Sequence, residues 1–158
     1  MALEVTRELS ILVRVPYGTP LPVVQRFVEK HWDWIAQAYA RQAERQAKHP
    51  EPTASEAASL RQKAQAILPQ KVRQYGAQMG VMPTAIHITS AKTRFGSCSA
   101  KNSISFSWRL MQYPEAAIDY VVVHELSHIL HHNHSRAFYD CIAQVMPDYR
   151  ERAQLLRT

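Results

Sequence analysis

The sequence is poor in cysteine and has no long hydrophobic run. Only two of its 158 residues are cysteines, Cys98 and Cys141, and they do not form a Cys-x-x-Cys pair. A disulfide framework is therefore excluded, and a reducing compartment is expected. No apolar run approaches the roughly 18 residues that a membrane-spanning helix needs. The first fifteen residues carry charges instead of the apolar stretch of a signal peptide. We therefore expect a soluble, cytoplasmic protein with no membrane partner.

The length and composition fit one compact domain. Hydrophobic residues make up 46% of the chain, which is enough for a buried core, and no internal repeat or low-complexity tract is present. We therefore expect a single domain over 1–158. Within it, 1–80 should hold a strand and two helices, and 81–158 should hold the chemically active core.

Basic residues outnumber acidic ones, and their distribution is uneven. The net charge is +6, and residues 87–114 contribute +4 of it without a single acidic residue. The basic residues of this acid-free stretch are Lys92, Arg94, Lys101 and Arg109. Such a surplus is typical of a well-solvated surface, but it also suits an anionic ligand or nucleic acid. No nucleic-acid-binding motif supports the last of these.

The first half of the chain predicts one strand and two helices. Residues 9–15 alternate between apolar and polar side chains, which is typical of a strand. Apolar residues then recur at helical spacing over 21–48, and the two prolines that follow should break this helix. Thr53 and Glu56 form a capping box that predicts the start of a second helix, and Gly80 should end it.

The second half predicts two strands and three helices. Alternating side chains predict strands over 85–89 and 104–109, separated by a polar loop. Helices are expected over about 114–132, over 135–146 and in a short final segment capped by Asp148. The order of these elements predicts an α+β fold in which helices cover a small β-sheet.

The segment His124-Glu125-Leu126-Ser127-His128 carries the strongest chemical signal. Residues four apart lie on the same face of a helix, so both imidazoles can bind one metal ion. Glu125 lies beside them and can take a proton from a water molecule that the ion has made more acidic. Two neutral imidazoles suit Zn²⁺, and the spacing is that of zinc peptidases.

A catalytic zinc site usually has three protein ligands and one open position. The histidines that follow the motif are His131, His132 and His134. His131 lies about 10.5 Å along a straight helix from His124, which is too far for one shared ion. Asn133 tolerates a left-handed conformation and could turn His134 back toward the ion. We therefore favour His134 as the third ligand. The acidic alternatives are Asp140 and Asp148.

Several segments of the second half form a recognisable combination. They are 95–99 (Phe-Gly-Ser-Cys-Ser), 102–110, 118–128, 133–135 (Asn-His-Ser) and 146–152. Together they resemble the YgjP-like metallopeptidase family, which is similar to the SprT-like and WLM zinc-peptidase domains. The resemblance is dense over 93–156 and looser over 9–79.

The resemblance implies a zinc metallopeptidase with a zincin-like fold and one metallopeptidase-like domain. It implies that His124, His128 and His134 bind the metal and that Glu125 is the general base. In similar zincins an extended substrate pairs with the strand before the active-site helix. That strand is expected over 104–110 in this chain.

Several neighbouring residues allow more than one interpretation. Cys98 either packs in a turn or takes part in the chemistry directly, and Cys141 is expected in the core. Asp119 either supplies negative charge at the start of a helix or orients a ligand imidazole. Candidates for stabilising an oxyanion are Tyr113, Tyr149 and Arg152.

Two hydrolytic functions fit these residues. The first is a zinc metallopeptidase that acts on polypeptides. The alternative is a metal-dependent phosphohydrolase that acts on nucleotides or phosphate esters, with the basic residues of the acid-free stretch holding the phosphate. In both functions Glu125 activates water beside the metal.

Overall fold

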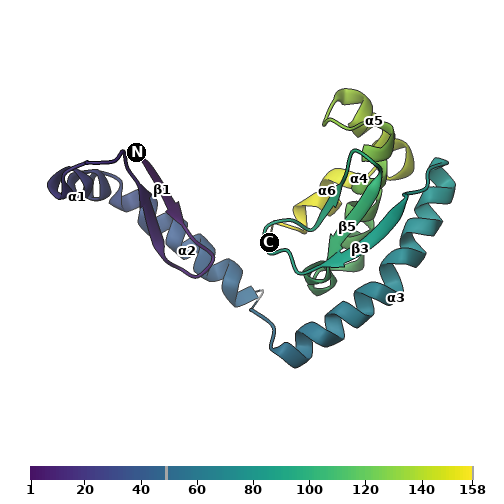
Figure 1. Ribbon diagram of the computed structural model, residues 1–158, viewed down its shortest axis with the longest axis horizontal. Coiled ribbons are helices and arrows are strands. Elements are labelled where there is room, and N and C mark those ends of the chain that lie inside the picture. Colours follow the sequence, from purple (N-terminus) through teal and green to yellow (C-terminus); the bar gives the residue numbers. More distant parts are fainter. Residues whose placement is uncertain (49, 158) are drawn as a thin grey trace. The chain divides into compact units, whose positions relative to one another are not determined.

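A β-hairpin and two helices form the first of the two units into which the chain divides, Met1–Glu51 and Pro52–Thr158 (Figure 1). The computed structural model describes residues 1–48 and 50–157. The expected single domain over 1–158 stays a prediction, because two compact units do not show whether the chain folds as one domain.

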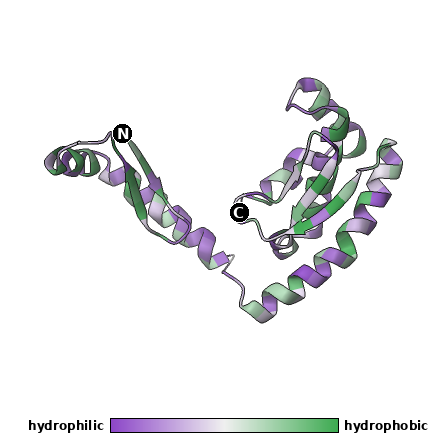
Figure 2. Cartoon of the chain, in the orientation of Figure 1, coloured by the Kyte–Doolittle hydropathy of each residue, from purple (hydrophilic) through white to green (hydrophobic). Residues whose placement is uncertain are grey.

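The hairpin joins β1 (Ala2–Val5) to β2 (Ile11–Arg14) in antiparallel register. The turn between them holds Leu9 at a φ of 61°. Figure 2 shows that hydrophobic residues dominate the hairpin. The strand predicted over 9–15 is confirmed in a shorter form. The sequence missed β1, because a strand of four residues is too short to display a repeated alternation.

The single helix predicted over 21–48 is wrong: the structure has α1 (Leu21–Lys30) and α2 (Trp32–Lys48) in its place. Between them, His31 has φ −106° and ψ 17°, outside the helical range. Its Nδ1 donates to the carbonyl of Phe27 at 2.8 Å, which helps to satisfy the end of α1. The spacing of apolar residues continues across this break, so the sequence did not reveal it.

The second unit begins with α3 (Ala54–Met79), and both of its ends are as predicted. The hydroxyl of Thr53 accepts a hydrogen bond from the backbone N–H of Glu56 at 3.2 Å. Gly80 ends the helix with φ 71° and ψ 31°, a left-handed conformation that glycine adopts without a steric penalty.

A three-stranded sheet follows, in the order β3 (Ala85–Thr89), β5 (Ser103–Ser107) and β4 (Gly96–Cys98). The central strand β5 is parallel to β3 and antiparallel to β4. Both expected strands are present. The sequence missed β4, because three small residues inside a polar loop show no alternation.

The strand predicted over 104–109 ends early, at Ser107. The chain continues as a short 3₁₀ helix, η1 (Trp108–Gln112). The buried hydroxyl of Ser107 accepts from the backbone N–H of Arg109 at 3.3 Å and donates to the carbonyl of Ala91 at 2.7 Å. These bonds cap the 3₁₀ helix. They explain why the chain leaves the strand after Ser107, although apolar and polar residues continue to alternate.

The remaining helices are α4 (Glu115–Leu130), α5 (Arg136–Val145) and α6 (Tyr149–Gln154). Ser135 caps α5 as predicted, since its hydroxyl accepts from the N–H of Phe138 at 3.3 Å. Asp148 precedes α6 but does not cap it with its side chain. Its carboxylate instead accepts from Nε of Arg152 at 3.0 and 3.1 Å. None of the described helices is long and apolar enough to cross a membrane.

The helix α4 is buried on two sides within the second unit. On one side it packs against α3, β5 and η1 in a cluster formed by Ala64, Leu68, Val72, Ile104, Phe106, Trp108, Leu110, Met111, Ile118, Val121, Val122 and Leu126. A second cluster joins it to α5 and consists of Val123, Phe138, Ile142 and Met146. This arrangement of helices around a small sheet confirms the predicted α+β fold. It also holds the residues of the metal-binding motif on a rigid element.

Asp119 of α4 connects this helix to α3 and α6. Its carboxylate lies 2.5 Å from Nζ of Lys71 and 3.0 Å from the hydroxyl of Tyr75. Arg152 approaches it at 3.9 Å. The structure therefore favours a structural role for Asp119 over the orientation of a ligand imidazole.

We predict that Asp119→Asn lowers the free energy of unfolding by about 1–3 kcal/mol at pH 7, because a half-buried lysine loses its closest charged partner. Glu115→Gln is the matched control. Glu115 also contacts Lys71, at 2.9 Å, but its side chain is exposed, so the loss should be smaller. Urea unfolding of the three proteins measures both differences, and equal losses would contradict this role of Asp119.

The same network predicts a pH dependence. Burial lowers the pKa of Lys71, but its hydrogen bonds to Asp119 and Glu115 outweigh burial and raise the pKa above the usual 10.5. A raised lysine pKa adds stability below the unfolded-state value and loses it as the pH rises through the folded-state value. The stability difference between wild type and Asp119→Asn should therefore stay constant from neutral pH up to about pH 10 and shrink above it.

Candidate metal centre

Three histidine side chains converge at the C-terminal end of α4. His124 and His128 lie on the helix and His134 lies beyond it, with one nitrogen of each within 4.8 Å of the others. Their ring centroids are 4.8 to 5.4 Å apart. The structure thus brings together all three histidines predicted as ligands. The acidic alternatives, Asp140 and Asp148, do not belong to this group.

His134 reaches the other two histidines because α4 ends at Leu130. His131 follows in an extended conformation, with φ −138° and ψ 102°, and redirects the chain. The expected left-handed turn at Asn133 is wrong: the described non-glycine residues with positive φ lie elsewhere. An extended residue at the helix end achieves the same reversal without a strained backbone.

Hydrogen bonds orient two of the imidazoles. Nδ1 of His128 donates to the carbonyl of His131 at 3.1 Å. Nδ1 of His124 lies 3.2 Å from the hydroxyl of Tyr120, one helical turn earlier on α4. With Nδ1 of each ring engaged in this way, Nε2 is the ring nitrogen that remains for another partner. Tyr120 thus has a positioning role that the sequence did not reveal.

Phe138 of α5 contacts all three imidazoles. Its ring stacks on that of His128, with centroids 4.4 Å apart and planes at 23°. It meets the rings of His124 and His134 edge-on, at 5.0 and 5.1 Å. Phe138 is fully buried, so it forms an apolar wall that keeps the three rings together. An apolar residue carries no chemical pattern, so the sequence did not reveal this role.

Burial favours the neutral form of two of the imidazoles, those of His124 and His128. It lowers the pKa of His124 to about 4, with a further contribution from His128 and His134 nearby. Burial also lowers the pKa of His128, although its bond to the His131 carbonyl opposes this effect. A neutral imidazole keeps a lone pair on one ring nitrogen, and this is the form that binds a metal ion.

Glu125 lies next to the histidines and is buried, with 6% of its surface exposed. Burial raises its pKa to about 7. Its side chain lies against the backbone of β4: a Cβ atom at Gly96 would stand 2.9 Å from Cγ and 3.2 Å from Oε1 of Glu125. Glycine at this position therefore makes room for the carboxylate.

A cavity of about 310 Å³ opens between β4 and α4 at these residues. Its walls are formed by Arg94, Gly96, Ser97, Cys98, His124, Glu125, His128, His132 and His134. Of the four basic residues in the acid-free stretch, Arg94 lines this cavity and the other three do not. Arg109, for example, stacks on the ring of Trp108 at 4.5 Å.

Cys98 lines the cavity and also packs against the hydrophobic core. Burial and the charge of Glu125 raise the pKa of its thiol. A protonated thiol is a poor nucleophile, so the structure favours the packing role. The proposed oxyanion partners Tyr113, Tyr149 and Arg152 are not among the residues that line this cavity.

The expectation that substrate pairs with the strand over 104–110 is wrong. β5 is the central strand, and its backbone already pairs with β3 on one side and β4 on the other. The strand at the edge of the sheet beside the cavity is β4. The sequence could not reveal this, because the position of a strand within a sheet depends on contacts between distant segments.

The three donors fit a metal ion. Bonds from imidazole nitrogen to zinc are about 2.0–2.1 Å long. Small rotations of the rings, which move each nitrogen by less than about 1 Å, would bring all three nitrogens within bonding distance of one ion. Three imidazole donors beside a buried carboxylate that is not itself a donor are typical of catalytic metal sites.

Comparisons with known proteins agree with this geometry. The family described as YgjP-like, metallopeptidase domain, matches residues 1–59 and 55–158. A search of curated proteins gave no match. Among solved structures, the metallopeptidase zymogen abylysin of Pyrococcus abyssi is similar, with a TM-score of 0.52 and 19% identity over 57% of this chain and 91% of that chain. That likeness shows the shared fold. The family match extends over both units, and the chain therefore belongs to the YgjP-like metallopeptidase domain family.

Proposed function

We propose that this protein is a zinc-dependent metallopeptidase in which His124, His128 and His134 hold the metal and Glu125 is the general base. The observation that carries the proposal is the cluster of three imidazole nitrogens within 4.8 Å of one another, in the same cavity as a buried glutamate. The membership of the chain in a metallopeptidase family supports peptide bonds as the target.

Zinc is the metal that this donor set suits best. The donor set consists of three imidazoles and contains no thiolate or carboxylate. Such a set suits a borderline-soft ion that is usually bound by four ligands in a tetrahedral arrangement. When bound, the ion polarises the carbonyl of the scissile bond and makes a water molecule more acidic.

Glu125 moves the proton in this mechanism. Its carboxylate accepts a proton from the attacking water and passes it to the nitrogen of the departing amine. Burial raises its pKa to about 7, so both its protonated and its ionised form are accessible near neutral pH. The backbone of Gly96 lies against the Glu125 side chain and limits the positions that the carboxylate can take.

The edge strand β4 supports an extended polypeptide as substrate. Its residues Gly96, Ser97 and Cys98 line the cavity, and their backbone pairs with β5 on one side of the strand. A peptide that adds to the other side would gain backbone hydrogen bonds and pass close to the histidines.

Peptide hydrolysis fits the cavity better than the alternative, phosphate-ester hydrolysis. A phosphohydrolase for nucleotides would need several cations around the phosphate. Arg94 lines the cavity, whereas Lys92, Lys101 and Arg109 do not. A single arginine also gives no support to a nucleic-acid partner.

We predict that His134→Ala weakens zinc binding by about tenfold to a hundredfold or more, because only two of the three imidazole ligands would remain. His132→Ala is the matched control, since His132 lines the cavity but is not part of the three-nitrogen cluster. Competition with a zinc-binding dye measures both affinities. If His132→Ala empties the site while His134→Ala leaves the affinity unchanged, the ligand assignment is wrong.

We predict that Glu125→Gln keeps zinc bound but lowers the cleavage rate by about 10²–10⁴-fold, because an amide of the same size cannot accept a proton. Cleavage of a panel of denatured proteins and peptides is the measurement. A chelator should abolish the wild-type activity, and added zinc should restore it. Full activity of Glu125→Gln would rule out the proposed mechanism.

We predict that Gly96→Ala lowers kcat by at least about tenfold with little effect on zinc affinity, because the added methyl group would displace the side chain of Glu125. The effect should be absent in a Glu125→Gln background, where there is no base left to misplace. An equal loss in both backgrounds would show that Gly96 acts on something other than the base.

A further inference from the structure

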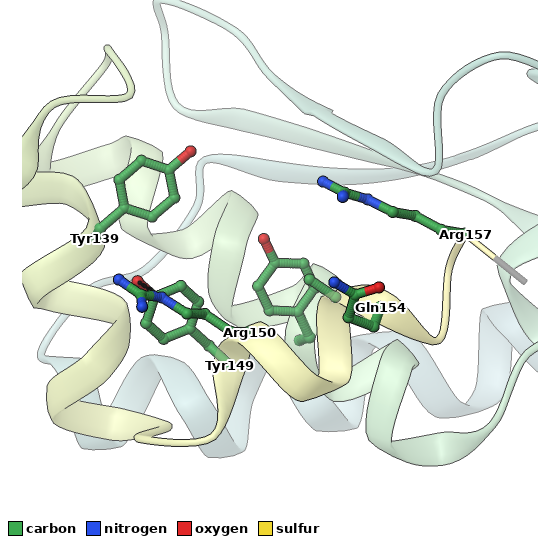
Figure 3. Close-up of a pocket in the computed structure, with 7 residues that line it drawn as sticks. Tyr139, Tyr149, Arg150, Gln154 and Arg157 are labelled. Atoms are coloured by element: carbon green, nitrogen blue, oxygen red, sulfur yellow. Dashed lines mark hydrogen bonds between the residues drawn. The ribbon is translucent and has the colours of Figure 1, made fainter.

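A second cavity, of about 400 Å³, lies between α4, α5 and α6 (Figure 3). Its lining residues are Tyr120, Tyr139, Tyr149, Arg150, Ala153, Gln154 and Arg157. The guanidinium of Arg157 and the hydroxyl of Tyr139 extend toward the same open space (Figure 3). The lining is thus rich in hydrogen-bond donors and contains no acidic residue.

The charge of this cavity is unbalanced. Arg150 and Arg157 are exposed, and neither forms an ion pair with a carboxylate of the residues that the structure describes. Nε of Arg150 donates to the hydroxyl of Tyr149 at 3.2 Å, and its guanidinium lies 5.7 Å from the centre of that ring. These contacts restrict the conformations of Arg150 and leave its terminal N–H groups available to a ligand.

The second cavity adjoins the histidine cluster. The hydroxyl of Tyr120 lies 3.2 Å from Nδ1 of His124, so Tyr120 lines one cavity and contacts a residue that lines the other. The ring of Tyr139 lies 6.4 Å from that of His134 and 6.1 Å from that of Tyr149. A ligand in the second cavity would therefore lie near the bond that is cut.

We infer that the second cavity binds a carboxylate group of the substrate and so sets the specificity of the peptidase. The inference rests on the proposed function. Two guanidinium groups, phenol hydroxyls and an amide together offer the donors that a carboxylate accepts, and arginine can bind it with two parallel hydrogen bonds. An apolar side chain could pack on the tyrosine rings but would leave the guanidinium groups and the amide without partners.

The first experiment compares pairs of peptides that are identical except for one residue, which is glutamate in one peptide and glutamine in the other. This residue is placed in turn at each position on both sides of the scissile bond. If a side chain supplies the carboxylate, kcat/KM should at one position be about tenfold higher for the glutamate peptide. In the double variant Arg150→Gln/Arg157→Gln this ratio should fall to about one. Arg73→Gln is the matched control, because it removes one exposed arginine of α3 that does not line the second cavity, and it should keep the ratio.

The carboxylate can come from an acidic side chain or from the C-terminus of the peptide. Amidation of the C-terminus separates the two sources. If the free C-terminus is the ligand, amidation should remove the preference for substrates that end near the cut bond. If an acidic side chain is the ligand, amidation should have no effect. A preference that depends on either source supports the inference. A glutamate-to-glutamine ratio of about one at every position, together with no effect of amidation, would overturn it.

A binding measurement keeps the inference testable without turnover. Isothermal titration of Glu125→Gln protein loaded with zinc should show tighter binding of the peptide that carries the preferred carboxylate, on a side chain or at the C-terminus, than of its amide counterpart, by about tenfold. The double arginine variant, with an unchanged melting temperature, should bind both equally. Equal binding by the protein with both arginines intact would overturn the inference.

The two proposals fail in different ways. If the wild-type protein cleaves no peptide but the titration shows the preference for a carboxylate over its amide, the proposed peptidase function fails and the carboxylate site stands. If peptides are cleaved with no preference, the peptidase function stands and the carboxylate site fails. Binding of inorganic phosphate that is tighter than binding of the glutamate peptide would also overturn the assignment to a substrate carboxylate.

Discussion

The packing of three imidazole rings around Phe138 is the interaction on which the candidate metal centre depends. His124 and His128 share a face of α4 by helical geometry, but His134 belongs to a loop that could have taken many paths. Phe138 stands within 4.4 to 5.1 Å of all three ring centroids and is itself fully buried. The hydrophobic effect that buries this ring in the second unit therefore also holds the polar site together.

The burial of α4 gives the site its chemistry. One side of the helix packs on the sheet and α3, the other packs on α5, and the motif lies between these two clusters. The same burial lowers the pKa of His124 and raises that of Glu125. Neutral imidazoles can bind a metal, and a glutamate that titrates near neutrality can accept and release a proton. Each property follows from the removal of water around the helix.

Local features of the fold were predictable from the sequence, and features that depend on distant contacts were not. The spacing of His124 and His128 and the cap at Ser135 involve residues within one turn, and the structure has both as expected. The place of β4 at the sheet edge depends on pairing with β5, which no local pattern encodes. Phe138 and Tyr120 escaped notice because a phenylalanine or tyrosine in a helix is most simply read as part of the core.

The most direct test of this account is a crystal structure of the zinc-loaded protein with anomalous diffraction data at the zinc edge. The account predicts one strong anomalous peak, about 2.0–2.1 Å from one nitrogen of each of His124, His128 and His134, with Glu125 outside bonding distance. A peak at other residues, or coordination of the ion by Glu125 or Cys98 in place of His134, would contradict it.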